Sequence, residues 1–295
     1  MSYLGLDLGT SSLKAVVVDD DDRVLGQATA ALTVSRPKPG WSEQEPQSWI
    51  DAARKAIAEL KGVVDLGQVA GIGLSGHMHG ATVLGADDTP LRPCILWNDT
   101  RAAEEAADFD RDPDFHRITG NIVFPGFTAP KIAWMRAHEP DLYAKIARVL
   151  LPKDYLRLWL TGGYVSEMSD ASGTAWLDVA TRDWSDDLLS ACHLNRDHMP
   201  KLFEGSAPVG RIKGWLGSDV GLGQIPIACG AGDNAAAAIG AGVVEDGAAF
   251  VSLGTSGVLF AATDAYRPNP ATAVHSFCHA VPDTWHQMGV IFPYT

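Results

Sequence analysis

The chain has 295 residues, 46% of them hydrophobic and 20% charged, and a formal net charge of −13. This length exceeds the usual single-domain size and predicts two domains, or one domain and part of another, around a sizeable core. The acidic excess argues against nucleic acid or an anionic membrane as a partner, because few basic side chains remain to neutralise many phosphates.

The amino terminus and the cysteines indicate a cytoplasmic protein. The first residues lead straight into a strand pattern, without the basic and then apolar segments of a signal peptide. No uninterrupted apolar run approaches membrane-spanning length. The four cysteines lack metal-ligand spacing, and we expect them to be reduced thiols: Cys94, Cys192, Cys229 and Cys278.

Strand and helix patterns alternate over the first hundred residues. Three consecutive strands are predicted at 3–6, 13–19 and 23–34. Pro46 then opens a helix whose apolar residues recur at helical spacing, and a buried-type strand follows at 69–74. Shorter strands at 81–84 and 93–97 precede an Ala- and Glu-rich helix that starts near Thr100. This order predicts an α/β domain with a mixed sheet.

The middle of the chain, residues 109–209, is less regular, and we interpret it as an insertion that shapes the substrate side. Short helices are predicted there at 131–137 and 154–160. The α/β pattern then returns, with a strand at 225–229, a glycine-rich bend and a helix at 235–239.

Two near-copies of one short motif are the most informative feature of the chain. They are LDLGTSS at 6–12 and VSLGTSG at 251–257. Each apolar run breaks into Gly-Thr-Ser and then resumes, which predicts a β-hairpin with a hydroxyl-rich turn. Such a turn can direct backbone N–H groups and hydroxyls at one anion. One copy would be ordinary turn chemistry, but two suggest a duplicated fold that holds a polyphosphate from both sides.

The first copy carries an extra carboxylate, Asp7, between Leu6 and Leu8. A carboxylate in a buried-looking strand is costly unless a charged group pairs with it. Mg²⁺ bound to phosphates would be such a partner, and the alternative is an Asp that caps the following turn. Lys14, two residues beyond the turn, is interpreted as a solvated charge on a strand.

Both motifs resemble the paired phosphate motifs of the actin-like sugar kinases, the FGGY family of carbohydrate kinases. Further segments resemble the bacterial members of that family that phosphorylate D-xylulose, and they span nearly the whole chain. These segments are WSEQ at 41–44, GHMHG at 76–80, ILWND at 95–99, PGFTAPK at 125–131, LPKDY at 151–155, GDNA at 232–235 and HSFCH at 275–279.

The resemblance implies an α/β fold of the actin-like ATPase, ribonuclease H-like type, with two domains that close on a cleft. Residues 1–243 would form a complete N-terminal sugar-binding domain, and residues 244–295 the incomplete start of the C-terminal nucleotide-binding domain. The expected reaction is phosphorylation of D-xylulose at its terminal hydroxyl, with ATP and Mg²⁺ as cofactors. The resemblance is also compatible with a homodimer.

The same resemblance implies roles for particular residues. Asp233 matches the catalytic base, and Met78 and His79 match the sugar-contacting loop. The metal and phosphate residues are Asp7, Thr10, Ser11 and the adjoining Ser12, with Gly254 and Thr255 in the second phosphate loop. Asn234, next to the base, is grouped with the sugar contacts.

The segment Trp97, Asn98 and Asp99 is a candidate wall of the sugar pocket, through apolar stacking and hydrogen bonds. An equally good interpretation is a strand end and the first helical turn, with Asp99 or Thr100 as the cap.

The local pattern leaves Asp233 two roles. A carboxylate can orient a sugar hydroxyl and take its proton as the bond to phosphorus forms. An Asp at this position can equally cap the helix that follows, and the resemblance favours the base. His79 follows a buried strand, at the carboxyl end where α/β folds place ligands, and its imidazole offers one donor and one acceptor. His77 is interpreted as an ordinary, partly buried residue.

The match to the family fades after His286, so we expect the adenine pocket to be missing and the 295-residue chain alone to transfer phosphate poorly. Two alternatives stay open. The chain is a kinase for D-xylulose or another sugar of the family, or it is a non-catalytic remnant that still binds a pentulose.

Overall fold

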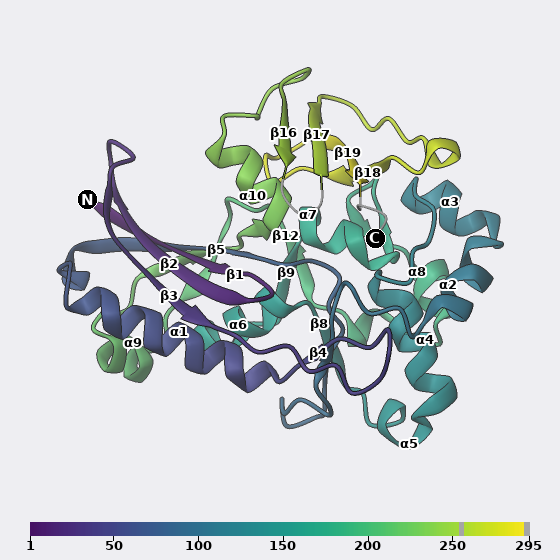
Figure 1. The fold of residues 1–295 in the computed structure, drawn as a ribbon, viewed down its shortest axis with the longest axis horizontal. Helices are drawn as coiled ribbons and strands as arrows, with labels where there is room; N and C mark the ends of the chain where they lie inside the picture. Colours follow the sequence, from purple (N-terminus) through teal and green to yellow (C-terminus); the bar gives the residue numbers. More distant parts are fainter. Residues whose placement is uncertain (254–256, 292–295) are drawn as a thin grey trace.

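The computed structural model describes residues 1–253 and 257–291, and its largest sheet has seven strands. The sheet is mixed, as the sequence predicts: its first three strands in chain order pair antiparallel, and the first of them also pairs parallel with a later strand (Figure 1). In spatial order the strands are β13 (Pro208–Arg211), β14 (Pro226–Ala228), β5 (Val69–Gly76), β1 (Ser2–Leu8), β2 (Ser12–Asp19) and β3 (Val24–Ala31), while β15 (Ala231–Gly232) pairs with β5.

One face of this sheet is covered by α1 (Pro46–Lys61), which lies beneath β2 and β3 in Figure 1. Alternation in β1 buries Leu4, Leu6 and Leu8 on one side of the strand. The helix buries Trp49 and Leu60 against that side, and each such side chain contributes about 1.5–3 kcal/mol when removed from water. The helical spacing seen in the sequence is therefore the packing face of α1.

The middle of the chain contains many short helices and contributes residues to both large hydrophobic cores. Leu156 and Leu160 belong to the core that contains the buried residues of β1 and α1, whereas Ile132 belongs to the core that also contains residues of the C-terminal sheet. The helices here are α2 (Ala103–Asp110), α3 (Pro113–Thr119), α4 (Thr128–His138), α5 (Pro140–Tyr143), α6 (Pro152–Thr161), α7 (Met168–Ala171), α8 (Asp186–Ala191) and, beyond residue 209, α9 (Gly214–Val220).

Short strand pairs and single 3₁₀ turns connect these helices. The pairs are β4 (Glu43–Gln44) with β7 (Cys94–Ile95), β6 (Thr82–Leu84) with β8 (Arg148–Leu150), β9 (Val165–Glu167) with β12 (Lys201–Phe203), and β10 (Leu177–Asp178) with β11 (Asp183–Trp184). The 3₁₀ turns are Leu66–Gln68, Ser172–Thr174, Arg196–His198 and Pro270–Thr272.

A second sheet of four strands ends the described chain, at the top of Figure 1. Its order is β16 (Ala249–Leu253), β17 (Gly257–Thr263), β19 (Trp285–Ile291) and β18 (His275–Cys278), and α10 (Asp233–Gly240) precedes it. Phe260 and Phe277 join the same core as residues of the middle segment, so this sheet packs directly on that segment. The division into domains at residues 243 and 244 stays a prediction.

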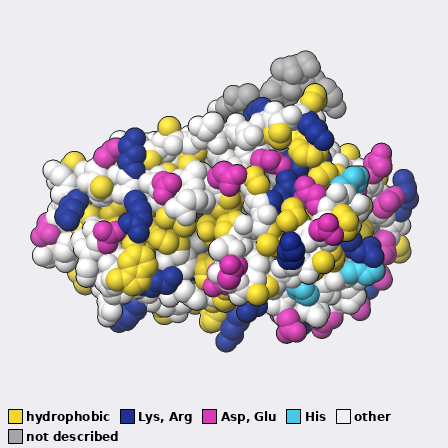
Figure 2. All heavy atoms as spheres, turned by 90° about the horizontal axis from the view of Figure 1, so that it is seen from below, with side chains coloured by type: hydrophobic (Ala, Val, Ile, Leu, Met, Phe, Trp, Pro, Cys, Tyr) yellow, Lys and Arg dark blue, Asp and Glu magenta, His cyan; other side chains and the backbone are white. Residues whose placement is uncertain are grey.

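The surface shows where charge lies on one face of the molecule. In Figure 2, acidic and basic side chains are interspersed among hydrophobic ones, without a continuous basic area on that face. None of the helices within 1–253 and 257–291 has both the length and the apolar character required to cross a bilayer. All four cysteines are free and buried.

Candidate active site

Three parallel strands end side by side, and the predicted site residues follow from that arrangement. Leu8 in β1 pairs with Gly76 in β5, and Gly76 pairs with Gly232 in β15. Asp233 comes directly after the last of these residues. Asp7 and Asp233 thus lie at the carboxyl ends of these strands, where α/β folds bind ligands, and they are close enough for the charge of Asp7 to act on Asp233.

Asp7 is exposed rather than embedded, which corrects the expectation drawn from its apolar neighbours. Leu6 and Leu8 point into the core, and the alternation of the strand turns Asp7 to the opposite face. Its Oδ1 accepts a 2.6 Å hydrogen bond from Ser75 Oγ on β5. Lys14, also exposed, pairs with Asp7 across the hairpin and so shares that face.

Asp233 is the first residue of α10, and Gly232 occupies the N-cap position without a side-chain cap. Its Oδ1 accepts hydrogen bonds from the backbone N of Asn234 at 2.7 Å and from Asn234 Nδ2 at 3.0 Å. The Asp233 carboxyl thus binds the backbone N–H of the second helical residue, but it does so from the first helical position and not from the N-cap position.

The pKa of Asp233 is raised to about 6, first by the protein atoms that crowd its carboxyl and then by the negative charge of Asp7. The residue as a whole is nevertheless exposed to solvent. A carboxylate poised near neutral pH and facing a second carboxylate is typical of a functional site.

His79 adopts an unusual backbone conformation, with φ at +68°. Its Nδ1 lies 2.7 Å from the carbonyl oxygen of Gly173. Because a carbonyl oxygen only accepts, Nδ1 carries the proton and Nε2 is left as an acceptor. Burial lowers the pKa of His79 to about 3, so the ring stays neutral at physiological pH. The ring also stacks on Phe127, with centroids 5.0 Å apart.

Glycines make room for the Met78–His79 loop. A Cβ on Gly173 would lie 2.4 Å from the His79 ring, and one on Gly232 would lie 3.0 Å from Met78 Cγ. Met78 is buried against the strand that leads into Asp233. The structure thus brings Met78, His79, Asp233 and Asn234 together, although their segments lie about 150 residues apart in the sequence.

The three residues of the loop after β7 differ in their hydrogen bonding. Trp97 Nε1 donates a 2.9 Å hydrogen bond to Thr10 Oγ1 and so ties this loop to the first hairpin. Asn98 Oδ1 is buried and has no hydrogen-bond partner among the described residues. Asp99 is fully buried, and its oxygens accept from Ser42 N at 2.6 Å and from Arg101 Nε at 2.9 Å. Its carboxylate is therefore committed to shaping the loop.

Both predicted hairpins are present in the backbone. In the first, Gly9 N donates to Ser12 O at 3.0 Å around a turn that contains Thr10 and Ser11. Gln44 Nε2 donates to Thr10 O at 2.7 Å and fixes this turn from below. The second hairpin is formed by β16 and β17. Its turn, with Gly254 and Thr255, lies outside the described residues.

The residues at the strand ends fit a hydrated Mg²⁺ that is also held by phosphates. Asp7 presents an exposed carboxylate, and its charge adds to the raised pKa of Asp233, as expected of two carboxylates that share a site. Within the described part of the chain, no group of three or more His, Cys, Asp or Glu side chains could hold a metal. Magnesium is commonly bound by one or two carboxylates together with substrate phosphates.

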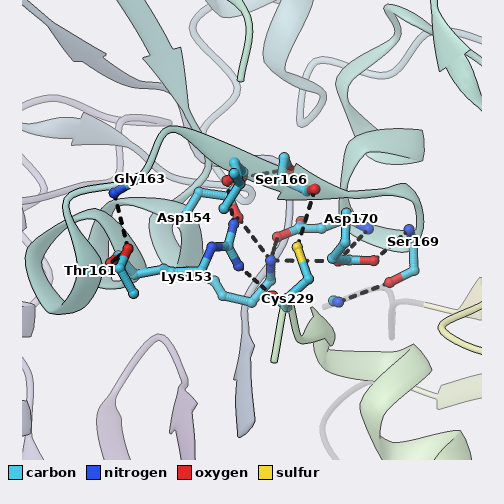
Figure 3. Close-up of polar contacts among 12 residues, drawn as sticks. Lys153, Asp154, Thr161, Gly163, Ser166, Ser169, Asp170 and Cys229 are labelled. Carbon is cyan, nitrogen blue, oxygen red and sulfur yellow. Dashed lines mark hydrogen bonds and ion pairs between the residues drawn. The ribbon is translucent and has the colours of Figure 1, made fainter. Parts of the chain in front are cut away.

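Behind the site lies a buried ionic cluster that sequence reasoning missed, made of Lys153, Asp154, Arg157, Glu167 and Asp170 (Figure 3). Lys153 Nζ is 2.9 Å from Asp154 Oδ1 and 3.2 Å from Asp170 Oδ2. Burial raises the pKa of Asp170 well above its ordinary value. The raised pKa favours a protonated, neutral Asp170. The two cations, Lys153 and Arg157, then face two carboxylates, Asp154 and Glu167.

This ionic cluster supports the strand that leads into Asp233. Arg157 donates to the carbonyl of Cys229 in the bend before β15. Ser169, next to Asp170, accepts a 3.0 Å hydrogen bond from Gly232 N (Figure 3). The approach to Asp233 also needs Gly230, where φ is +92° and a Cβ would lie 2.2 Å from the Leu74 carbonyl oxygen.

A groove of ≈ 520 Å³ lies elsewhere, between the end of β3 and α1. Polar side chains such as Glu43, Ser48 and Lys55 line it, and none of the predicted site residues does. The candidate site is thus the open face at the strand ends, not this groove.

Comparison with known proteins agrees with this fold. The model of the FGGY family of carbohydrate kinases, N-terminal domain, matches residues 2–240, and the chain belongs to this family. It is 50% identical over 290 residues to the xylulose kinase of Escherichia coli strain K12, covering 98% of this chain and 60% of that protein. The chain is 37% identical to the xylulose kinase of Bacillus subtilis, and the match covers 98% of this chain and 59% of that protein.

Solved structures of sugar kinases superpose closely on this chain. A xyloylose kinase from Brucella ovis superposes with a TM-score of 0.97 at 58% identity, covering 98% of this chain and 60% of that one. A xylulose kinase from Rhodospirillum rubrum gives 0.93 at 29%, with the same coverage. The predicted actin-like fold is confirmed. The chain spans about 60% of the length of the curated relatives it matches.

Proposed function

We propose that the chain carries the sugar-binding and base-supplying half of an ATP-dependent kinase that converts D-xylulose to D-xylulose 5-phosphate. The observation that carries the proposal is the meeting of Asp233 with the Met78–His79 loop at the strand ends, with a carboxylate whose pKa is about 6. The similarity to proteins named xylulose kinase supports D-xylulose as the sugar.

Asp233 acts as the general base in this proposal. At neutral pH its carboxylate is mostly ionised, and it is basic enough to take the proton from a sugar hydroxyl as that oxygen attacks phosphorus. The hydrogen bonds from Asn234 keep one carboxylate oxygen in place and leave the other to face the substrate.

The sugar contacts come from side chains with free hydrogen-bonding capacity. Nε2 of His79 accepts from one sugar hydroxyl, and the buried Oδ1 of Asn98 accepts from another. Asn234 adds amide groups next to the base. Met78 and Trp97 supply apolar walls. Asp99 stays in the proposal as the residue that holds the Trp97 and Asn98 loop, because Oδ2 accepts from Ser42 N and Oδ1 accepts from Arg101 Nε.

The phosphates of ATP lie against the first hairpin, at Thr10, Ser11 and Ser12, and against Gly254 and Thr255 of the second. Mg²⁺, held by Asp7 and those phosphates, supplies charge neutralisation when bound. Residues 1–243 are proposed as the sugar-binding domain and 244–295 as the first part of the nucleotide-binding domain. A cytoplasmic location and a homodimer belong to the same proposal.

D-xylulose is expected to raise the melting temperature of the chain. A ligand at about 100 times its Kd stabilises the folded state by about 2.7 kcal/mol, which corresponds to a shift of a few degrees. Differential scanning fluorimetry with D-xylulose, D-ribulose and glycerol measures this and ranks the sugars. A folded sample that gives no shift with millimolar D-xylulose would contradict the pocket, and a larger shift with D-ribulose would favour another substrate.

Phosphoryl transfer is expected to decline in acid. Since the base must be ionised, kcat/KM should fall about tenfold per pH unit below the pKa of about 6. His79, with a pKa of about 3, remains neutral throughout and adds no second step. The measurement is a pH series of ADP release with D-xylulose. A rate that stays constant from pH 7 to pH 5 would contradict Asp233 as the base. D-xylulose binding without transfer would favour the non-catalytic alternative.

A further inference from the structure

Lys131 in α4 is a buried ammonium whose hydrogen bonds go to backbone carbonyls. The side chain has 0% exposure. Its Nζ donates to the carbonyl oxygen of His79 at 2.8 Å and to that of Gly126 at 2.6 Å. A buried charge is costly unless its hydrogen bonds are well made, so these two carbonyls are held firmly.

The first carbonyl belongs to the residue with the strained backbone. His79 has a left-handed φ of +68°, which a side chain with a Cβ rarely adopts. Thr128 Oγ1, one turn earlier on α4, donates to the same carbonyl at 3.2 Å. Two donors from one helix therefore converge on this peptide, and they compensate for its unfavourable conformation.

The second carbonyl lies beside the other wall of the candidate sugar pocket. Gly126 is so close to Trp97 that a Cβ placed on it would lie 2.5 Å from the Trp97 carbonyl oxygen. Lys131 thus connects the loop that contains His79 with the segment packed against Trp97. Removing its Nζ would free both sides at once.

We propose that Lys131 is a positioning residue that holds His79 and the Trp97 segment in the geometry needed for sugar binding. The expected effect on D-xylulose binding rests on the proposed function. The expected effect on the backbone of the His79 loop rests only on the hydrogen bonds described above. Both hydrogen bonds of Lys131 Nζ go to backbone carbonyls, so its effect on the sugar passes through His79 and Gly126.

Charge on Lys131 strengthens this arrangement, because charge-assisted hydrogen bonds are the stronger ones. Burial lowers the pKa of Lys131 to about 7, while Cys94 and Asp99 oppose that shift and Arg101 adds to it. The histidines on the adjoining loop, His77 and His79, have pKa values of about 3, and that of Cys94 is about 11. Between pH 7 and 9, Asp233 is already ionised, so a loss of sugar affinity over this range reports on Lys131.

The test compares Lys131→Met with Ile132→Val, a mild change at a buried neighbour in the same helix. Titration calorimetry should show that Lys131→Met weakens D-xylulose binding by about tenfold or more, the value of one charged hydrogen bond. Ile132→Val should stay within about twofold, since its loss is spread over packing. Wild-type affinity should fall severalfold from pH 7 to 9, and that fall should be absent in Lys131→Met.

A readout without sugar separates this inference from the proposed function. The amide of Gly80 donates to Met78 O at 2.9 Å across the strained peptide, and its hydrogen exchange should accelerate in Lys131→Met but not in Ile132→Val. Thr128→Val, which removes the second donor, should show a smaller acceleration and serves if Lys131→Met does not fold. If the wild type binds no pentulose, the proposed function fails while the exchange result still decides the role of Lys131. If the Gly80 amide exchanged at the same rate in Lys131→Met, Thr128→Val and Ile132→Val, the proposed positioning role of Lys131 would be overturned.

Discussion

Replacing Asp233 by Asn is expected to lower phosphoryl transfer by about 10²–10⁴-fold, the usual contribution of a general base. Asn keeps the shape of Asp but cannot accept the proton of the attacking hydroxyl. Affinity for D-xylulose should remain within severalfold, because the substitution leaves the proposed contacts from His79 and Asn98 unchanged. The effect should therefore appear in kcat rather than in KM.

The same variant should not destabilise the fold. A carboxyl whose folded pKa is raised lowers stability once it ionises, so its cost is absent below its ordinary pKa and complete above about 6. Removing the charge at pH 7 should leave the melting temperature unchanged or slightly higher. A functional group that the fold tolerates at a cost is typical of an active site.

The measurement uses the 295-residue chain and a fusion to the remaining C-terminal part of the Escherichia coli relative, since the chain spans 60% of that protein. ADP release and sugar binding are followed in both. Asp141→Asn, an exposed carboxylate on α5, is the matched control and should change neither quantity. Turnover by Asp233→Asn at the wild-type rate would reduce Asp233 to a structural role at the start of α10.

Sequence patterns were sufficient where structure is local. The apolar spacing from Trp49 to Leu60 became the packing face of α1, and the Gly-Thr-Ser motif at 9–11 became the turn of the hairpin. Asp233 and His79 follow apolar strands, and such strands end at the edge of the sheet where ligands bind. Those positions were predictable from the order of the chain alone.

Residues whose partners are distant in sequence were interpreted less well. Asp99 is held by Ser42, which lies 57 positions away, so its local pattern could not tell a sugar contact from a structural bond. Asp7 was expected to be embedded, because the apolar neighbours hide the alternation that turns it outward. Ser75, its hydrogen-bond donor, could have been found from the pairing of β1 with β5.

The ionic cluster is the clearest example of what local patterns miss. Lys153, Asp154 and Arg157 resemble the polar face of a surface helix, yet all three side chains have 0% exposure. Their excess positive charge is balanced by Glu167, while Asp170, whose protonated form burial favours, contacts Lys153. Both residues come from the next elements of the chain. Tertiary pairing makes this burial tolerable, and no periodicity in the sequence records it.

Removing Asp154 is accordingly expected to destabilise the protein severely. Although burial alone would raise it, Lys153 and Arg157 hold the pKa of Asp154 below its ordinary value. Its Oδ2 also accepts a 2.6 Å hydrogen bond from Ser166 Oγ. In Asp154→Ala both cations remain buried without this carboxylate, and breaking such a pair costs about 3–5 kcal/mol. That is a large part of the 5–15 kcal/mol typical of folded domains.

The chain offers a matched control for this prediction. Asp114 and Arg117 form the same i, i+3 pair on α3, with side chains 52% and 65% exposed. Because exposed pairs contribute about 0–1 kcal/mol, Asp114→Ala should hardly move the urea midpoint, whereas Asp154→Ala should unfold the protein or shift the midpoint strongly. Asp154→Asn, which keeps the hydrogen bond from Ser166 but loses the charge, should fall between the two. Equal midpoints for Asp154→Ala and Asp114→Ala would mean that the buried cations are neutralised by other groups, and that the strand before Asp233 does not depend on this carboxylate.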